Sequence, residues 1–382
     1  MLQDFELEKL VEPLLEWFRG HARVLPWREE PTPYRVWVSE IMLQQTRVEA
    51  VKPYFERFTK ALPDVQALAE CPEDELLKLW EGLGYYNRVR NMQKAAIQVI
   101  ESYGGVIPAE YEELLKLKGI GHYTAGAIAS IAYGQYVPAV DGNVLRILTR
   151  ATADNTDIMK QSFRSEIEQT LLAMMKQLTI PDALKKRLQG ENIPGALNQA
   201  MMELGATVCV PNGAPLCGEC PWQDCCLAKK EGRILELPVK SKAKARKIEK
   251  RTVLILRDGD KVAIRKRSSE GLLAGLYELP NVEGDLEPEK VLEVVKQMEL
   301  VPIRIQKLAP AKHIFSHIEW HMNGYAILLE GTDMPKANNL LFVDADDASE
   351  RYAIPAAFAA YAGYMNIKLG NERFEESMDS PE

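Results

Sequence analysis

Long apolar runs are missing from this sequence of 382 residues. A membrane-spanning helix needs about 20 consecutive apolar residues, and an export signal needs a basic end followed by an apolar core. The first 20 residues are instead amphipathic and acidic, MLQDFELEKLVEPLLEWFRG. We therefore expect a cytosolic protein without membrane association.

Net basic charge and dispersed cysteines are also missing. The formal net charge of −8 excludes a uniformly basic nucleic-acid coat, although a local basic surface or a helix N-terminus can bind phosphate inside an acidic chain. Cysteine is scarce, and five of the six cysteines lie between Cys209 and Cys226. A disulfide framework spreads its cysteines, so this clustering indicates a metal or cluster site.

Four of these cysteines have the spacing Cys209-x7-Cys217-x2-Cys220-x5-Cys226. Four thiolates in a short loop can hold a [4Fe–4S] cluster or a zinc ion. Zinc sites usually offer two close pairs, and only Cys217 and Cys220 form such a pair, so we favour the cluster. Cys225 is surplus and could replace Cys226.

The length exceeds what one hydrophobic core usually serves, so two domains are expected. Residues 1–230 have helical periodicity and should form a mostly α domain. Residues 231–250 are rich in Lys and Arg without periodic apolar positions, which is typical of a linker. Residues 251–368 should form a smaller α+β domain, followed by an acidic, disordered tail over 369–382.

The apolar spacing predicts individual elements. Helices are expected at 3–19, 33–58, 63–70, 73–80, 86–103, 109–116, 123–132, 143–152, 162–177, 194–207, 287–298 and 355–366. Strands are expected at 252–256, 262–264, 276–279, 303–308, 314–320 and 325–329.

A glycine hairpin lies within residues 115–128, where Gly119 and Gly121 precede a helix of small residues. Two such glycines permit positive φ and a close approach to another molecule. The N–H groups of the following helix form an anion site suited to a phosphodiester. Beyond that helix stands a lone acid, Asp141. This pattern indicates an enzyme acting on nucleic acid, and the competing interpretation is an ordinary loop between packed helices.

Glu40 is the only charged residue of the segment 36–46, VWVSEIMLQQT. A carboxyl in an apolar helical turn is costly to ionise, so its pKa should be raised. A solvent-facing Glu would be the commoner case, but Trp37, Ile41 and Leu43 leave little solvent face. We therefore favour a functional carboxyl.

A second glycine turn, at 82–84, should present Leu83 and Tyr85 at its tip, with Arg88 and Arg90 starting the next helix. An aromatic tip backed by arginines suits base stacking and phosphate contact. A tyrosine in a helical core is the alternative.

Five motifs, taken in order, resemble the MutY family of adenine DNA glycosylases, in the helix-hairpin-helix superfamily that includes endonuclease III. The motifs are SEIMLQQT at 39–46, EGLGYY at 81–86, the hairpin at 117–125, VDGN at 140–143 and FSH at 315–317, with the cysteine loop between the last two. The resemblance covers essentially the whole chain. It implies a helix-hairpin-helix glycosylase fold with a [4Fe–4S] cluster, followed by a Nudix-like domain.

The implied enzyme excises adenine mispaired with 8-oxoguanine, and less readily with guanine, from duplex DNA after flipping the base from the stack. A protonated Glu40 would donate to adenine N7, and an ionised Asp141 would stabilise the oxocarbenium character of the sugar. Tyr123 and Asn143 match residues that position these carboxyls. Trp27 and Arg28 lie where the family lines its adenine pocket. The resemblance implies a monomer acting on this mispair.

Residues implied to contact DNA or 8-oxoguanine come from four segments. They are Gln45 and Thr46, Leu83 and Tyr85, Gly119 and Gly121, and Phe315, Ser316 and His317. Gln45 would fill the vacated stack and Tyr85 would stack beside 8-oxoguanine.

Position 123 distinguishes two activities within the superfamily. Relatives with lyase activity carry a lysine there, which forms a Schiff base with the sugar, whereas Tyr123 implies a hydrolase without lyase activity. Two features depart from the family: the first inter-cysteine gap is one residue longer, and Gln199 replaces an acidic residue of some relatives.

Two other classes of protein compete with this interpretation. A non-catalytic DNA-binding or redox-sensing protein would leave Glu40 and Asp141 unexplained. A Nudix hydrolase would need an acidic Mg²⁺-binding helix, which the segment 287–296, EPEKVLEVVK, does not provide.

Overall fold

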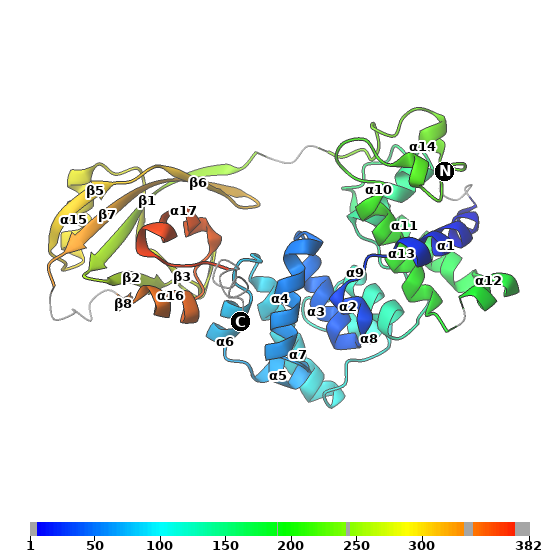
Figure 1. Ribbon diagram of the computed structural model, residues 1–382, viewed down its shortest axis with the longest axis horizontal. Helices are drawn as coiled ribbons and strands as arrows, with labels where there is room; N and C mark the ends of the chain where they lie inside the picture. The colour runs from blue at the N-terminus through cyan, green and yellow to red at the C-terminus, as the bar shows by residue number, and fades with distance from the viewer. Residues whose placement is uncertain (1–5, 189, 242–244, 332–338, 371–382) are drawn as a thin grey trace, which may run out of the picture. The chain divides into compact units, whose positions relative to one another are not determined.

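The computed structural model describes residues 6–188, 190–241, 245–331 and 339–370 (Figure 1). By its internal contacts the chain divides into two compact units, one formed by residues 1–70 and 91–242, the other by residues 71–90 and 243–382. Most of the tail expected at 369–382 lies outside the described residues. No helix in the described part of the chain has both the length and the apolar character needed to span a membrane.

Most of residues 7–230 is helical, as the sequence predicts. The longer helices are α1 (Val11–His21), α3 (Pro33–Leu43), α4 (Val48–Ala61), α7 (Asn87–Tyr103), α10 (Gly142–Ala151), α11 (Gln161–Gln177) and α13 (Ile193–Thr207). Shorter helices are α2 (Pro26–Glu29), α5 (Val65–Glu70), α6 (Glu73–Leu79), α8 (Tyr111–Leu114), α9 (His122–Ala127), α12 (Asp182–Arg187) and α14 (Leu227–Lys230).

The core of the first unit lies where α1, α10, α11 and α13 meet. Leu14, Leu148, Leu171 and Leu204 are each at most 1% exposed within this cluster. In each helix other buried apolar residues stand three or four positions away, such as Val144 from Leu148 and Ile167 from Leu171, which is why the periodicity predicts the helices.

One prediction in this unit is wrong: the helix expected over 33–58 is two helices, α3 and α4. Gln45 lies between them with φ of 62°, in the left-handed region, so the helix cannot continue through it. The short α12 has no counterpart among the predictions.

The second unit contains an eight-stranded mixed sheet. Five strands follow the order β3-β2-β1-β7-β5, and the other three pair beside them, β4 with β1, β6 with β7 and β8 with β2. Its strands are β1 (Lys247–Asp258), β2 (Lys261–Lys266), β3 (Tyr277–Glu278), β4 (Asn281–Glu283), β5 (Pro302–Lys307), β6 (Ala311–Ile314), β7 (Ile318–Leu329) and β8 (Leu340–Val343). The long strands β1 and β7 run parallel to each other. The other pairings are antiparallel.

Both faces of this sheet are covered. Along β1, Val253 and Ile255 join one apolar cluster, and Leu254 and Leu256 join the other, as the two-residue period of a strand requires. Helix α15 (Pro288–Gln297) covers the second face, and the turns at 356–365, including α17 (Ala359–Ala362), cover the first (Figure 1).

Three predictions in the second unit need correction. The strand expected at 314–320 is interrupted, because β6 ends at Ile314 and β7 starts at Ile318. The helix expected at 355–366 is a series of short helical turns, and α16 (Ala345–Arg351) was not predicted. β1 begins at Lys247, inside the segment predicted as a linker.

Segment 71–90 is tied to the second unit by a buried carboxylate. Glu81 is 1% exposed and accepts hydrogen bonds from the backbone N–H of Ile354 at 2.8 Å and of Gly370 at 3.2 Å. The Lys78 ammonium lies 2.8 Å from the same carboxylate and donates to the Tyr352 carbonyl at 2.9 Å. The segment that carries Tyr85 is therefore bonded to the chain that follows α16 in the second unit.

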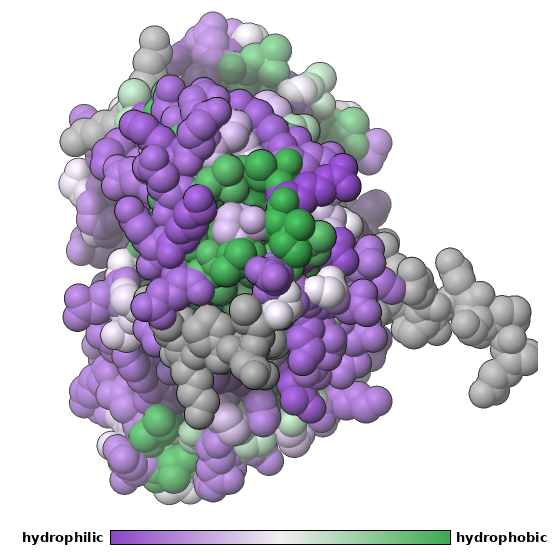
Figure 2. All heavy atoms as spheres, turned by 90° about the vertical axis from the view of Figure 1, so that its left-hand side faces the viewer, coloured by the Kyte–Doolittle hydropathy of each residue, from purple (hydrophilic) through white to green (hydrophobic). Residues whose placement is uncertain are grey.

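Most of the surface seen from the β5 and α15 side is hydrophilic, and its most extended apolar area lies near the middle of the view (Figure 2). Exposed apolar side chains at this end of the fold include Val301, Ile303 and Leu328.

Candidate active site

Glu40 is buried on α3, as the sequence predicts. The Thr32 hydroxyl caps this helix by accepting from the Arg35 N–H at 3.3 Å. Trp37 and Val38 beside Glu40 are fully buried, and Glu40 itself is 5% exposed. Burial raises the pKa of Glu40 to about 7, opposed by the hydrogen bond from Tyr123 and reinforced by the charge of Asp141. The predicted rise in this pKa is confirmed.

Tyr123 reaches Glu40 from α9. Its hydroxyl donates to Glu40 Oε2 and lies 3.4 Å from the Met202 sulfur. Burial, with the charges of Glu40 and Asp141, raises the pKa of this phenol well above its ordinary value. Tyr123 therefore stays protonated at neutral pH and acts as a hydrogen-bond donor.

The hairpin before α9 uses its two glycines differently. Gly119 has φ of 79°, and a Cβ there would lie 2.8 Å from the Asn91 Cβ, so only glycine fits. Gly121 has φ of −98°, so the positive φ that both glycines permit is adopted at Gly119 and not at Gly121. Both glycines are exposed, which leaves the backbone of the hairpin accessible.

Asp141 caps the N-terminus of α10. Its Oδ1 accepts from the Val144 N–H at 2.8 Å, and its Oδ2 accepts from the Asn143 amide at 2.7 Å. Burial raises the pKa of Asp141, while these two donors and the charge of Arg146 oppose the rise. Two donors and a helix N-terminus stabilise a carboxylate, so Asp141 is better suited to carry negative charge than Glu40.

A chain of hydrogen bonds runs from Asp141 to the cysteine loop. Arg146 donates to Asn143 Oδ1 at 2.7 Å and to the Cys209 carbonyl at 2.8 Å. Arg150 donates to the Cys209 sulfur at 3.3 Å. The orientation of Asn143 toward Asp141 is thus fixed by a guanidinium that also holds Cys209.

Arg28 faces Glu203, a residue that the sequence analysis missed. The Glu203 carboxylate is 1% exposed and lies 2.9 Å from Arg28 and 2.6 Å from Arg23. Arg28 also donates from Nε to Gln199 at 3.0 Å. Glu203 is the only charged residue of α13, which is the same signal that identified Glu40.

These groups surround one cavity of about 180 Å³ in the first unit. It is lined by Trp27, Arg28, Glu40, Thr46, Tyr123, Asp141, Asn143, Gln199, Met202 and Glu203, among others. The structure thus brings the six residues predicted for catalysis and the adenine pocket to one place. Two carboxyls in unlike surroundings, beside a cavity for a small flat group, suit general acid catalysis and stabilisation of a cation.

Of the residues predicted to contact DNA or 8-oxoguanine, Thr46 lines this cavity, and the others are not among its lining residues. Gln45 is exposed between α3 and α4. Tyr85 is 51% exposed with φ of 47°, but Leu83 is only 6% exposed, so the expectation that the turn presents both is wrong for Leu83. The arginines behind the tip are engaged by the protein: Arg88 donates to the Leu83 carbonyl at 3.0 Å, and Arg90 lies 2.6 Å from Glu73.

The Phe-Ser-His segment forms the turn between β6 and β7. Phe315 packs edge-on against Trp320, with ring centroids 5.0 Å apart, whereas Ser316 and His317 are exposed. The Ser316 and Tyr85 hydroxyls lie 3.0 Å apart. Two of the predicted 8-oxoguanine contacts are therefore joined within the second unit.

Within the cysteine loop, the adjacent residues Cys225 and Cys226 have different charged neighbours. Burial, together with the charges of Cys209, Cys226 and Cys217, raises the pKa of Cys220 to about 12. Burial and the charges of Cys209 and Cys217 likewise raise the pKa of Cys226. The charged neighbours of Cys225 are instead Lys230 and Asp224. The four cysteines of the predicted spacing are thus mutual neighbours, and Cys225 is not among them.

Although these four thiols are neighbours, they do not surround a common centre at metal-binding distance. In the described part of the chain, no three His, Cys, Asp or Glu side chains are placed to hold a metal ion. Four sulfurs around one zinc ion must each lie about 2.3 Å from it. Cys209, Cys217, Cys220 and Cys226 are the residues that would hold either group.

The Glu203 ion pairs should contribute strongly to stability. We expect Glu203→Gln to lower the free energy of unfolding by about 3 kcal/mol or more, because it leaves two guanidinium groups beside a buried site without a counter-charge. Urea denaturation followed by circular dichroism measures this loss. The control is Glu191→Gln, whose partner Arg19 and own carboxylate are 44% and 36% exposed, and it should cost less than about 1 kcal/mol. Equal losses in both variants would contradict the assignment of Glu203 as a buried anchor.

Comparison with known proteins identifies both units. Residues 38–172 match the family model of the HhH-GPD superfamily base excision DNA repair protein, and residues 251–362 match the NUDIX domain. The chain is 33% identical to the adenine DNA glycosylase of Rattus norvegicus over 91% of its own length and 77% of that protein. It is 32% identical to the adenine DNA glycosylase of Buchnera aphidicola subsp. Schizaphis graminum, over 81% of this chain and 84% of that protein.

Among solved structures, a thermostable thymine-DNA glycosylase aligns with 59% of this chain and 97% of its own, with a TM-score of 0.49 and 25% identity. The fold class predicted from the sequence, a helix-hairpin-helix glycosylase domain followed by a Nudix-like α+β domain, is confirmed. The identity with curated relatives over most of both chains establishes that this chain belongs to the adenine DNA glycosylase family of base excision repair enzymes.

Proposed function

We propose that this glycosylase excises adenine mispaired with 8-oxoguanine by hydrolysing the N-glycosidic bond, leaves an abasic site, and lacks efficient lyase activity. The observation that carries the proposal is the pairing of Glu40 with Tyr123 beside Asp141 at one cavity. The enzyme acts as a monomer on duplex DNA, and it excises adenine opposite guanine less readily than adenine opposite 8-oxoguanine.

Breaking the glycosidic bond leaves negative charge on the base and positive charge on the sugar. Glu40 holds a proton near neutral pH and donates it to adenine N7, so the base departs as a neutral group. Asp141 stabilises the oxocarbenium character at C1′ as an ion or through a transient covalent bond. Glu40, now ionised, accepts a proton from the water that attacks C1′. The proton that Glu40 gives to adenine is thus replaced by one from the attacking water, and the hydroxyl group of that water stays on C1′.

The adenine pocket is formed by Trp27, Arg28 and the newly identified Glu203. A guanidinium and a carboxylate held against each other offer a donor and an acceptor to the edge of a flipped base. The accessible hairpin at Gly119 and Gly121 binds the phosphate backbone independently of sequence. Gln45, exposed and in the left-handed region, fills the stack that the flipped base leaves, with Thr46 and Leu83 as neighbours of the lesion.

The second unit supplies recognition of the opposite base. The paired hydroxyls of Tyr85 and Ser316, with Phe315 and His317 beside them, form a polar and aromatic edge that suits stacking and hydrogen bonding to 8-oxoguanine. The buried Glu81 ties the segment that carries Tyr85 to the backbone of Ile354 and Gly370 in the same unit.

A [4Fe–4S] cluster is proposed for Cys209, Cys217, Cys220 and Cys226. Their mutual proximity and partial burial support it, as does the absence of any disulfide among the described cysteines. When bound, such a cluster would cross-link residues 209–226. Arg146 and Arg150 would then connect this rigid loop to Asn143 and Asp141.

The pH dependence of adenine release tests the role of Glu40. Its protonated form dominates below a pKa of about 7, so the single-turnover rate should fall about tenfold per pH unit above pH 7. Glu40→Gln should lose this dependence and release adenine about 10²–10⁴-fold more slowly. Glu49→Gln, at an exposed position on α4, should retain the wild-type profile. A profile in Glu40→Gln that matches the wild type would exclude Glu40 as the acid.

Borohydride trapping tests the absence of lyase activity. Tyr123 cannot form a Schiff base, so the wild type should give no efficient covalent complex with adenine-mispaired DNA after reduction. Tyr123→Lys places an amine at that position and serves as the positive control. Efficient trapping of the wild type would overturn the assignment as a monofunctional hydrolase.

Substitutions of the hydroxyl pair formed by Tyr85 and Ser316 test recognition of 8-oxoguanine. Ser316→Ala and Tyr85→Phe should each reduce the preference for adenine opposite 8-oxoguanine over guanine about 2- to 10-fold, since each removes one hydrogen bond. The double variant should be little worse than either single variant, because they break the same pair. Ser162→Ala, on the exposed start of α11, is the control. An unchanged preference in both single variants would remove the hydroxyl pair from recognition.

Iron analysis tests the cluster and its ligands. The purified wild type should be brown and contain iron and sulfide. Cys226→Ser should lose most of the iron, while Cys225→Ser should keep it, because Cys225 lies apart from the other four. A colourless protein containing zinc would exclude the cluster, and iron loss in Cys225→Ser alone would reverse the ligand assignment.

A further inference from the structure

Tyr85 has a backbone conformation that a tyrosine rarely adopts. Its φ is 47°, in the left-handed region, although its side chain is 51% exposed and is not fixed by burial. A bulky residue stays in that region only where the surrounding contacts hold it there. Specific contacts within the second unit, to which residues 71–90 belong, must therefore hold the turn that carries Tyr85.

Arg88 contacts this turn at several points. One nitrogen of its guanidinium donates to the Leu83 carbonyl at 3.0 Å and to the Gly84 carbonyl at 3.3 Å. Its guanidinium carbon lies 5.5 Å from the centre of the Tyr85 ring and 5.3 Å from that of the Trp80 ring. The indole of Trp80 donates to the same Gly84 carbonyl at 3.0 Å. Arg88 thus joins the two peptide groups that precede Tyr85 to the ring of Tyr85 itself.

The place that Arg88 occupies requires a guanidinium group. Burial lowers the pKa of Arg88 to about 10, so the side chain still carries its charge at neutral pH. A guanidinium donates hydrogen bonds in its own plane and stacks on aromatic rings with its faces. Arg88 can therefore bind the carbonyls of the turn and pack against two rings at the same time, which an ammonium group cannot do.

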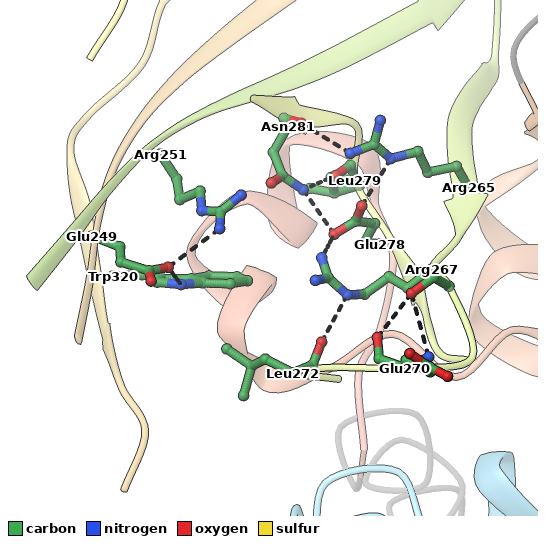
Figure 3. Close-up of polar contacts among 11 residues, drawn as sticks. Glu249, Arg251, Arg265, Arg267, Glu270, Leu272, Glu278, Leu279, Asn281 and Trp320 are labelled. Carbon is green, nitrogen blue, oxygen red and sulfur yellow. Dashed lines mark hydrogen bonds and ion pairs between the residues drawn. The ribbon is translucent and has the colours of Figure 1, made fainter. Parts of the chain in front are cut away.

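Phe315, the other aromatic residue of the recognition edge, is supported from different elements. It packs against Trp320, with ring centroids 5.0 Å apart. Figure 3 shows the indole of Trp320 donating to Glu249, at 3.2 Å, with the guanidinium of Arg251 bound to the same carboxylate. Phe315 is thus supported from β1 and β7, whereas Tyr85 is supported from the start of α7.

The orientation of the Tyr85 ring decides where its hydroxyl lies, 3.0 Å from the Ser316 hydroxyl. We propose that Arg88 is a positioning residue for recognition of the opposite base, because it holds the Tyr85 ring in place before DNA binds. The inference rests on the proposed function, in which Tyr85 and Ser316 recognise 8-oxoguanine. A ring that is already ordered loses little conformational freedom when a base stacks on it. Arg88 thereby increases the preference for 8-oxoguanine without touching the base.

A positioning role for Arg88 differs measurably from a direct contact with the DNA backbone. A guanidinium that binds a phosphate strengthens the binding of every duplex alike and makes it more dependent on salt. A guanidinium that fixes Tyr85 changes the ratio of adenine release between the two mispairs instead. The ratio and the salt dependence together therefore separate the two roles.

Single-turnover adenine release by the full-length protein tests the proposal. Arg88→Met should reduce the preference for adenine opposite 8-oxoguanine over guanine about 3- to 10-fold, since the Tyr85 ring becomes free to turn. Arg88→Lys keeps the charge but not the planar fork, so it should lose the preference as well. Thermal melts of each variant establish that it is folded.

Arg90→Met is the matched control. Arg90 lies two residues further along α7, and its guanidinium binds Glu73 and the Ala274 carbonyl, each at 2.6 Å, instead of the turn. This variant removes a contact of the same segment without touching Tyr85. It should therefore keep the wild-type preference.

Coupling to Tyr85 is the readout that a merely structural role would not move. Tyr85→Ala removes the ring that Arg88 holds. In that background, Arg88→Met should have no further effect on the preference, because two residues that act through one ring are not additive.

The outcomes distinguish a failure of this inference from a failure of the proposed function. An unchanged preference in Tyr85→Ala would remove Tyr85 from recognition of 8-oxoguanine, and the inference would fall with it. A reduced preference in Tyr85→Ala, with a wild-type preference in both Arg88 variants or with additive losses, would overturn the role of Arg88 alone. An equal loss of affinity for all duplexes in Arg88→Met, with a salt dependence smaller by about one ion, would make Arg88 a phosphate contact instead.

Discussion

The hydrogen bond from the Tyr123 hydroxyl to the Glu40 carboxyl is the interaction on which the rest of the active centre depends. Glu40 is 5% exposed between buried apolar side chains of α3, so its charged form is poorly solvated. One phenol is too weak a donor to offset that burial, and the pKa of Glu40 remains raised to about 7. The helices α3 and α9 thus hold a proton where a leaving base would need it. A second donor at Glu40 would lower its pKa and remove the proton.

Asp141 is the second carboxyl of the active centre, and its surroundings differ from those of Glu40. It caps α10, accepts hydrogen bonds from Val144 and Asn143, and has the Arg146 charge nearby. Arg146 also binds the Cys209 carbonyl, so the orientation of Asp141 is tied to the loop of cysteines. The close packing behind it needs glycine at Gly205, where a Cβ would lie 2.6 Å from the Asn143 Cβ. Asp141 is therefore held by several hydrogen-bond donors and close contacts, whereas Glu40 accepts its hydrogen bond from Tyr123 of α9.

Local rules predict much of this arrangement from the sequence. A lone charge in an apolar helix identified Glu40, and the same rule applied to α13 would have found Glu203. The pairing of Arg28 with Glu203 could not be predicted, because it joins residues 175 positions apart through tertiary packing. The break at Gln45 was missed for a similar reason, since helical periodicity continues through it while the backbone turns to φ of 62°. Leu83 and Tyr85 alternate between buried and exposed in one turn, which glycine spacing alone does not determine.

The central claim is that Glu40 carries a proton near neutral pH while its neighbour Asp141 carries the charge. Isotope-edited infrared titration of the full-length protein, with Glu40→Gln as the reference, measures this directly through the carbonyl stretch of a protonated carboxyl. We expect a band present at pH 6, absent from Glu40→Gln, and lost with an apparent pKa near 7. A Glu40 band already lost near the ordinary value of 4.5 would contradict the account.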